Sequence, residues 1–274
     1  MRRSPVRAFH GLIIRFAFLA ALGVIAWFIV DAYVPTRHLP WKPVDLNQPA
    51  GLATHMQITE LAADRDACIL ALHEAGVEVV PAEDVDGAEP FCQVRNAVRI
   101  KSGVTSMSPN DLVMSCPLVA AYVVWDRQVL QPAAQETLQS PVTGLVSYGT
   151  YSCRRMYGGA DSNPSEHARA NALDIGEFKL ADGRRISVLE GWPTVGPEAD
   201  FLRRVREGGC QVFRTVLGPD YNAAHANHLH FDMGNSDYCP HGPATVAPAP
   251  PSDALPPLTP APAAESAEAP ADSI

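Results

Sequence analysis

The sequence lacks several patterns that would assign a function directly. None of its six cysteines lies in a CxxC pair, which argues against a structural zinc knuckle and against a thioredoxin-type redox motif. Basic residues are in the minority, so the formal net charge is −9 and the pI is near 5.4. A chain without a broad basic face is poorly suited to following phosphates, and we therefore expect no nucleic-acid partner.

One apolar run, FAFLAALGVIAWFIV, covers residues 16–30. With its flanks it approaches the roughly 20 residues that a helix needs to span a bilayer, although Arg15 and Asp31 interrupt it. The arginines that precede the run should stay in the cytoplasm. We expect residues 1–35 to form a cytoplasmic stub and an uncleaved signal anchor. A cleaved signal peptide is the alternative, but no small-x-small site directly follows the run.

Cysteine usage agrees with export of everything that follows the anchor. An even number of scattered cysteines in an oxidising compartment predicts three disulfides. The sequence alone leaves the pairing open. Pairing of neighbours along the chain is our expectation, joining Cys68 to Cys92, Cys116 to Cys153, and Cys210 to Cys239.

Composition divides the exported part into three regions. Residues 36–55 are rich in proline and polar residues and are predicted to be a linker. Residues 56–240 mix short β-branched runs with helical apolar spacing, as in a helix over 59–75. They predict an α+β domain with a small antiparallel sheet flanked by helices. Residues 241–274 are rich in proline and alanine and predict a disordered tail.

The stretch SEHARANALDIGEF places His167 and Asp174 seven positions apart. A single helix would separate the two residues by roughly 10 Å along its axis, too far for both to bind one ion. The alternation in ALDI instead predicts a strand that turns Asp174 away from Leu173 and Ile175. If His167 lies on a turn that folds back over this strand, the two side chains converge.

A second stretch, HANHLHFDM, alternates in the same way. A strand here would turn its apolar residues to the core, namely Leu229, Phe231 and Met233. Its polar residues would face a cleft on the other side, namely His228, His230 and Asp232. Two such strands would together supply His167, Asp174 and His230. Three protein ligands with a fourth position left for water are typical of catalytic zinc sites.

The segments YSCR, SEHARANALDIGEFKLADGR and VLGPDYNAAHANHLHFD resemble the bacterial extensin-like C-terminal domain proteins, a family distinct from plant cell-wall extensin. The likeness covers most of residues 59–239. The polar clusters also resemble the metal sites of zinc D-Ala-D-Ala carboxypeptidases and murein endopeptidases. That resemblance implies a Zn²⁺ ion bound by His167, Asp174 and His230.

The same resemblance suggests roles for other residues. His228 matches an extra histidine that the endopeptidases use beside the metal, and it is the first candidate for a general base, with His225 the second. Arg154 resembles the arginine that binds the substrate carboxylate, although Arg155 could serve instead. Asp232 is expected to be a structural or orienting carboxylate rather than a ligand.

The chain departs from the peptidase pattern at two positions. Asn227 stands where the carboxypeptidases have a glutamate base, and Ala170 stands where the group usually has glycine. We therefore hold two hypotheses. The first is a single-pass inner-membrane protein whose periplasmic domain is a zinc metallopeptidase acting on peptidoglycan stem or cross-bridge peptides. The alternative, favoured by the absent glutamate, is a non-catalytic cell-wall binding or structural module of the same fold.

Overall fold

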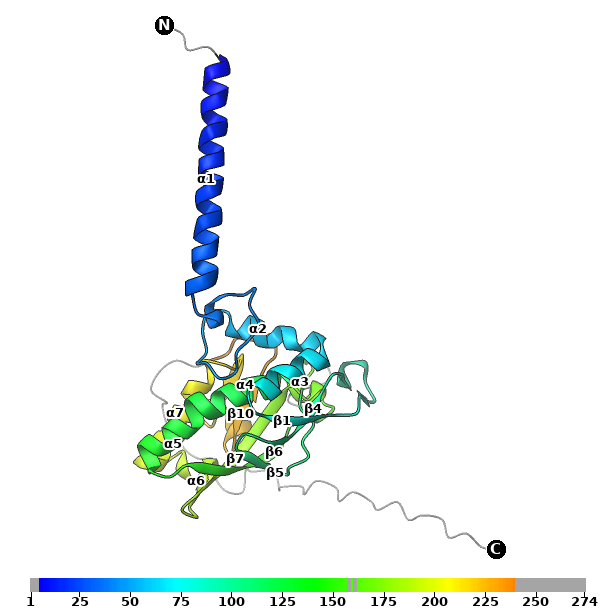
Figure 1. Cartoon of the computed structure of the whole chain (residues 1–274). Coiled ribbons are helices and arrows are strands. Elements are labelled where there is room, and N and C mark those ends of the chain that lie inside the picture. Colours follow the sequence, from blue (N-terminus) through cyan, green and yellow to red (C-terminus); the bar gives the residue numbers. More distant parts are fainter. Residues whose placement is uncertain (1–4, 157–158, 160–161, 240–274) are drawn as a thin grey trace, which may run out of the picture.

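A long N-terminal helix, α1 (Pro5–Tyr33), projects away from the rest of the protein (Figure 1). The computed structural model describes residues 5–156, 159 and 162–239, so the predicted tail over 241–274 lies outside the described residues. Within α1, Leu12–Tyr33 is long and apolar enough to cross a membrane and none of it is buried. A signal sequence near the N-terminus has the same properties, so this helix is a candidate span by length and composition.

The main sheet has the strand order β5-β6-β7-β10-β9, with β8 paired to β7. All neighbours in it are antiparallel except β5 and β6. Its strands are β5 (Ser106–Ser108), β6 (Val142–Gly149), β7 (Ala172–Leu180), β8 (Arg185–Ser187), β9 (Thr215–Leu217) and β10 (Leu229–Asp232). The predicted α+β class is confirmed.

Two short antiparallel ribbons accompany the main sheet. One pairs β1 (Glu78–Pro81) with β4 (Val98–Ser102), and the other pairs β2 (Val85–Asp86) with β3 (Gln93–Val94). The turn η3 (Pro90–Cys92) leads into β3.

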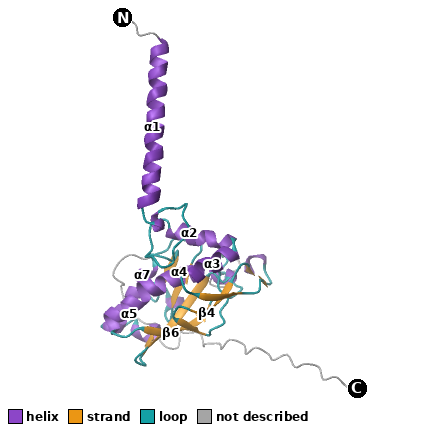
Figure 2. Ribbon diagram, in the orientation of Figure 1, coloured by secondary structure: helices purple, strands orange, loops and turns teal. Residues whose placement is uncertain are grey.

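Helices cover one face of the main sheet (Figures 1 and 2). They are α4 (Cys116–Trp125), the π-helical turn η4 (Asp126–Leu130), α5 (Gln131–Leu138), α6 (Val188–Gly191) and α7 (Pro197–Gly209). Every residue of α4 is buried, as expected for a helix that is apolar on all sides. The Trp125 ring lies 5.0 Å from the Phe231 ring of β10, so α4 packs directly on the strand that carries His230.

The helix predicted over 59–75 is interrupted. The structure has α2 (Thr54–Glu60), a turn η2 (Leu61–Ala63) and then α3 (Arg65–Glu74). The Asp64 side chain accepts hydrogen bonds from the first backbone N–H groups of α3 and so starts a new helix. Gly76, at a φ of +71°, follows the end of α3, where a left-handed residue is common.

The segment before α2 contains one short turn, η1 (Thr36–His38), and packs on the domain. Leu39 and Leu46 are buried, and Leu46 belongs to the main core. The Gln57 side-chain amide donates to the carbonyl oxygens of Thr36, Leu39 and Lys42. The segment therefore attaches to the domain over its length as well as joining the domain to α1.

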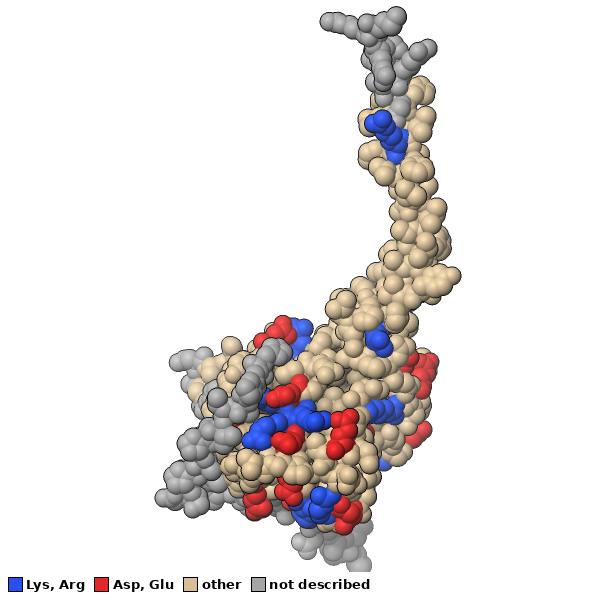
Figure 3. Space-filling view, turned by 90° about the vertical axis from the view of Figure 1, so that its left-hand side faces the viewer, with Lys and Arg blue, Asp and Glu red and all other residues tan. Residues whose placement is uncertain are grey.

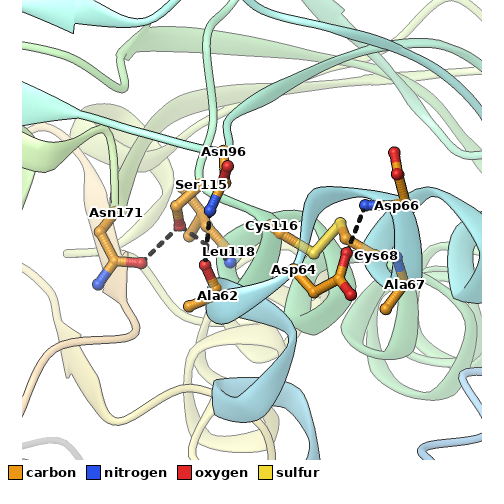
Figure 4. Close-up of a disulfide and its surroundings, with 10 residues drawn as sticks. All are labelled: Ala62, Asp64, Asp66, Ala67, Cys68, Asn96, Ser115, Cys116, Leu118 and Asn171. Carbon is orange, nitrogen blue, oxygen red and sulfur yellow. Dashed lines mark hydrogen bonds between the residues drawn. A yellow bond between two sulfur atoms is a disulfide. The ribbon is translucent and has the colours of Figure 1, made fainter.

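The disulfides join Cys68 to Cys116, Cys92 to Cys153, and Cys210 to Cys239. Neighbour pairing is correct for the last pair and wrong for the other four cysteines. The physical reason is that α3 and the start of α4 lie side by side, which brings Cys68 to Cys116 (Figure 4). Cys92 then lies against the segment that follows β6 and leads to Arg154.

Figure 4 also shows how this helix pair is tied to β7. The Ser115 hydroxyl accepts a hydrogen bond from the Leu118 N–H, which caps α4. The same hydroxyl donates to Asn171 Oδ1 over 2.6 Å, and Asn171 immediately precedes β7. The strand that carries Asp174 is thus held at its first residues.

Replacing Cys92 and Cys153 by alanine should lower the free energy of unfolding by about 4 kcal/mol, because this disulfide closes a loop with a sequence separation of 61. Denaturant unfolding measures the change. The control removes Cys210 and Cys239, whose separation of 29 predicts a loss about 0.7 kcal/mol smaller.

Peptide mapping without reduction should recover the three observed pairs, and recovery of a Cys68–Cys92 peptide would contradict this fold.

Candidate metal centre

Three segments that are distant in sequence bring His167, Asp174 and His230 together. His167 lies on the turn η6 (Glu166–Arg169), Asp174 on β7 and His230 on β10. The antiparallel register places His230 directly opposite Asp174, and His230 Nδ1 lies 2.8 Å from Asp174 Oδ1. A common helix for His167 and Asp174 is therefore excluded, and the turn-and-strand arrangement is the one observed.

Alternation along β7 explains why Asp174 faces away from the helices. Leu173 and Ile175, its neighbours, are fully buried in the main core, so Asp174 points to the opposite face of the sheet. The strand β10 differs from the prediction in one respect. Both of its faces are buried, because the segments that carry His167 and His225 cover the side on which His230 lies.

Local backbone geometry orients His167. The Ser165 hydroxyl accepts a hydrogen bond from the His167 N–H and begins the turn, while Ala170 ends it in the left-handed conformation at a φ of +52°. Ala170 is the position where the resembling peptidases usually have glycine, and here an alanine adopts the conformation that glycine favours. The imidazole Nδ1 lies 3.3 Å from the Thr150 carbonyl oxygen, which leaves Nε2 toward Asp174.

His167 Nε2 carries the strongest indication of a metal. It is buried and lies 3.1 Å from Asp174 Oδ2, but it has no hydrogen-bond partner of acceptable geometry among the described residues. A buried nitrogen without a partner is costly unless another group binds it. One ligand atom each from His167, Asp174 and His230 lies within 4.8 Å of the others. Ligand atoms around one zinc ion are roughly 3–4 Å apart, so these residues fit a metal ion.

Asp232 contacts the ring nitrogen of His230 that does not face Asp174. Its Oδ2 lies 2.9 Å from His230 Nε2, and its Oδ1 accepts a hydrogen bond from the Gly234 N–H. Because Nε2 is bonded to Asp232, Nδ1 is the nitrogen of His230 that points to Asp174. A carboxylate bonded to the far nitrogen of a histidine fixes its ring orientation and tautomer, as is common around metal ligands.

The protonation of the site follows from burial and from the opposite charges inside it. Burial would raise the pKa of the Asp174 carboxyl, but the imidazoles of His167 and His230 hold that pKa well below its ordinary value. Burial opposes the charged form of His230, yet its hydrogen bonds to Asp174 and Asp232 prevail and raise its pKa to about 10. Without a metal, the protonated ring of His230 therefore lies between the carboxylates of Asp174 and Asp232.

Two further histidines lie beside the three candidate ligands. His228 precedes β10 by one residue, with Nε2 at 3.6 Å from Asp174 Oδ1 and Nδ1 at 2.9 Å from Asn227 Oδ1. His225 ends the turn η7 (Ala223–His225), and its ring centre lies 5.0 Å from that of His228. Burial lowers the pKa of both imidazoles, that of His225 to about 3. Both rings are therefore neutral at pH 7, and the low pKa makes His225 the weaker base of the two.

A cavity of about 870 Å³ opens over this set of side chains, and Arg154 lines it. Arg155 does not. Its guanidinium lies 4.7 Å from the centre of the Phe91 ring and donates to the Ser162 carbonyl oxygen. Of the two arginines that the sequence left open, Arg154 is the one that faces the cavity.

The family described as "Extensin-like protein C-terminus" matches residues 66–240, which include all of these side chains. The chain belongs to this family. No curated protein and no solved structure matches it. The extensin-like resemblance is thus confirmed, while the likeness to zinc peptidases remains an argument from the site.

The extensin-like domain has one feature near the site that sequence reasoning missed. The pairing of β6 with β7 is irregular next to Asp174, where neither Tyr148 nor Gly176 is paired with a residue of the opposite strand. A Cβ on Gly176 would overlap the Tyr148 ring, so only glycine allows that ring to lie there. The Tyr148 ring also packs edge-on against His228, with ring centres 6.0 Å apart. The glycine inside a strand pattern was the available signal, since it often marks a bulge or a close approach.

Replacing Asp232 by asparagine should weaken zinc binding about 10- to 100-fold, because the amide no longer fixes His230 as the carboxylate does. Competition with a chromogenic chelator measures the affinity. The matched control is Asp237→Asn, which changes an exposed carboxylate on the wall of the same cavity, paired with Arg214. We expect the control to bind zinc as the unchanged protein does. Equal weakening in both variants would show that Asp232 has no particular role.

Proposed function

We propose that this extensin-like protein is a membrane-anchored, exported zinc metallopeptidase that acts on peptidoglycan stem or cross-bridge peptides. The observation that carries the proposal is the convergence of His167, Asp174 and His230, with one ligand atom from each within 4.8 Å of the others and the buried Nε2 of His167 making no hydrogen bond of acceptable geometry among the described residues. Those three side chains lie at a cavity large enough for a short peptide. The paired cysteines support export, because disulfides persist in oxidising compartments such as the periplasm.

The residues of the site have separate tasks in this proposal. His167, Asp174 and His230 hold the zinc ion, and Asp232 keeps His230 in place. Zinc, when bound, activates water and polarises a carbonyl group. His228 accepts the proton that the attacking water loses and passes it to the leaving amine, since its Nε2 is adjacent to Asp174. His225 stands behind His228 as the second candidate for this step.

Arg154 is assigned to the substrate. Its planar guanidinium suits a carboxylate, with which it can form two parallel hydrogen bonds. Peptidoglycan stem peptides offer such carboxylates, which is why the resemblance to the carboxypeptidases and endopeptidases supports this class of substrate. Arg154 brings a positive charge to the wall of the cavity that the candidate metal ligands also line.

A non-catalytic wall-binding module is the second candidate, and one observation favours it. Asn227 occupies the position of the carboxypeptidase glutamate, and its Oδ1 lies against His228 Nδ1. An amide cannot serve as a general base. If His228 does not replace that glutamate, the cavity would bind wall peptides without cleaving them.

The test is metal content together with digestion of muropeptides by the full chain, produced in an oxidising compartment. We expect about one zinc per chain, cleavage of the peptides, and loss of both in His167→Ala/Asp174→Ala. His228→Ala should keep the metal and lose cleavage. The control is His73→Ala, an exposed histidine on α3 that is outside the cavity.

The outcomes separate the two candidates. A folded, disulfide-bonded protein that takes up no zinc would overturn the metallopeptidase. Zinc binding and retention of wall peptides without cleavage, unchanged in His228→Ala, would establish the binding module instead.

Arg154→Lys should raise KM for muropeptides about 10-fold with a smaller effect on kcat, because lysine cannot form the paired hydrogen bonds of a guanidinium. Arg155→Lys is the matched control, since the neighbouring side chain packs on Phe91 outside the cavity. Steady-state kinetics on both variants decides the point. A larger KM effect from Arg155 than from Arg154 would reverse the assignment.

A further inference from the structure

The chain that follows α1 turns back along the helix instead of leading away from it. The rings of Trp27 and Trp41 are stacked, with centres 4.3 Å apart and planes at 26°. Trp41 Nε1 donates to Asp31 Oδ1, and Lys42 Nζ forms an ion pair with Asp31 Oδ2, both at 2.8 Å. Three contacts thus hold the loop at residues 41–42 against the last turns of α1.

These contacts determine the depth at which Trp41 lies. The apolar stretch ends at Tyr33 and is 22 residues long, about the thickness of the hydrocarbon core at 1.5 Å per residue. Trp27 is six residues before that end, or about 9 Å along the helix axis. Since Trp41 stacks on Trp27, it lies at the same level. The ion pair of Asp31 with Lys42 would be costly inside hydrocarbon, so we expect the boundary between hydrocarbon and headgroups to lie at this level, before Tyr33, with the helix residues that precede Leu12 completing the span. Tryptophan and the long side chain of lysine are favoured at that boundary.

The loop that carries Trp41 is part of the domain and not a free tether. The side-chain amide of Gln57, on α2, donates hydrogen bonds to three carbonyl oxygens of this segment, those of Thr36, Leu39 and Lys42. Leu39 and Leu46, on either side of the loop, are buried. The domain therefore cannot move away from the end of α1 without breaking this packing.

Two exposed apolar side chains lie on the segment that joins α1 to the domain and on the helix α2 that follows it. Leu52 is 90% exposed and Met56 is 47% exposed. The Leu52 N–H donates to His38 Nδ1 over 3.2 Å, which places Leu52 next to the turn η1. On the face shown in Figure 3, largely uncharged surface continues from α1 onto the domain at this junction. Such surface is expected where a protein meets an apolar partner.

We propose that the domain rests directly on a phospholipid bilayer through Trp41, Leu52 and Met56. The bilayer is the partner because this surface is continuous with the candidate span and adds tryptophan and lysine at the interfacial level. The inference rests on α1 spanning the membrane, as the proposed function also holds, but it does not depend on the chemistry of the metal site. In this proposal, residues 36–55 hold the domain against the lipid and do not act as a free linker.

Tryptophan quenching in vesicles tests the proposal with the full chain. The protein has four tryptophans, and Trp125 and Trp192 are buried in the domain. Trp27→Phe leaves Trp41, Trp41→Phe leaves Trp27, and the double variant gives the background. In phosphatidylethanolamine and phosphatidylglycerol vesicles brominated near the headgroup end of the acyl chains, we expect Trp41 to be quenched by a factor close to that of Trp27.

A matched pair of added tryptophans tests the surface itself. In the double variant, Leu52→Trp should be quenched by the same vesicles, whereas Val195→Trp should not. Val195 is 93% exposed and lies between α6 and α7, and Figure 1 shows α6 at the end of the domain away from α1.

Three outcomes would overturn the proposal. Quenching of Trp27 and Trp41 without quenching in Leu52→Trp would mean that the surface around Leu52 does not contact lipid. Quenching of neither Trp27 nor Trp41 would mean that α1 does not span, which also removes the anchor from the proposed function. Quenching of Trp27 alone, with neither Trp41 nor the tryptophan of the Leu52→Trp variant affected, would mean that the domain stands away from the bilayer. The outcomes in which Trp27 is quenched would leave the proposed metallopeptidase untouched.

Discussion

The buried carboxylate of Asp174 is the constraint on which the site depends. A charge removed from water costs several kcal/mol unless partners compensate it. Here the imidazoles of His167 and His230 lie within 3.1 Å and 2.8 Å of its two oxygens, and His228 is next to them. The need to surround one carboxylate explains why a turn and two strands from distant parts of the chain meet at this point.

The fold meets that need by giving the main sheet two different faces. Leu173, Ile175 and Phe231 fill the helical side, where Trp125 of α4 packs against β10. That side supplies stability and holds the two strands in register. The other side is therefore available for polar residues, because the core does not depend on them. The Cys92–Cys153 disulfide restrains the segment that delivers Arg154 to this second face.

The two proposals describe one arrangement when they are taken together. If α1 spans the bilayer, the contacts of Trp41 and Lys42 with α1 would set the height of the domain above it, while the sheet sets the position of the cavity within the domain. A site carried in this way would act on wall peptides close to the membrane. The reach of the protein would then be limited by packing at the junction and not by the length of a linker.

Much of the site could be predicted from the sequence because its signals are local. Alternation around Asp174 and around His230 depends only on the two-residue period of a strand, and both strands are present. The helix break at Asp64 was missed because the apolar spacing continues across it, while the capping bond depends on the backbone. Tyr148 was missed because its place over Gly176 arises from a register irregularity between two strands.

By itself, then, the sequence determined the α+β class, the apolar N-terminal helix, and the strand positions of Asp174 and His230, since each follows from composition or short periodicity. Only the tertiary structure decided the partners of Cys68 and Cys92, the position of Arg154 rather than Arg155 at the cavity, and the return of Trp41 to α1. Those features join residues that are far apart along the chain. Their distances depend on how the whole domain packs, which no local pattern records.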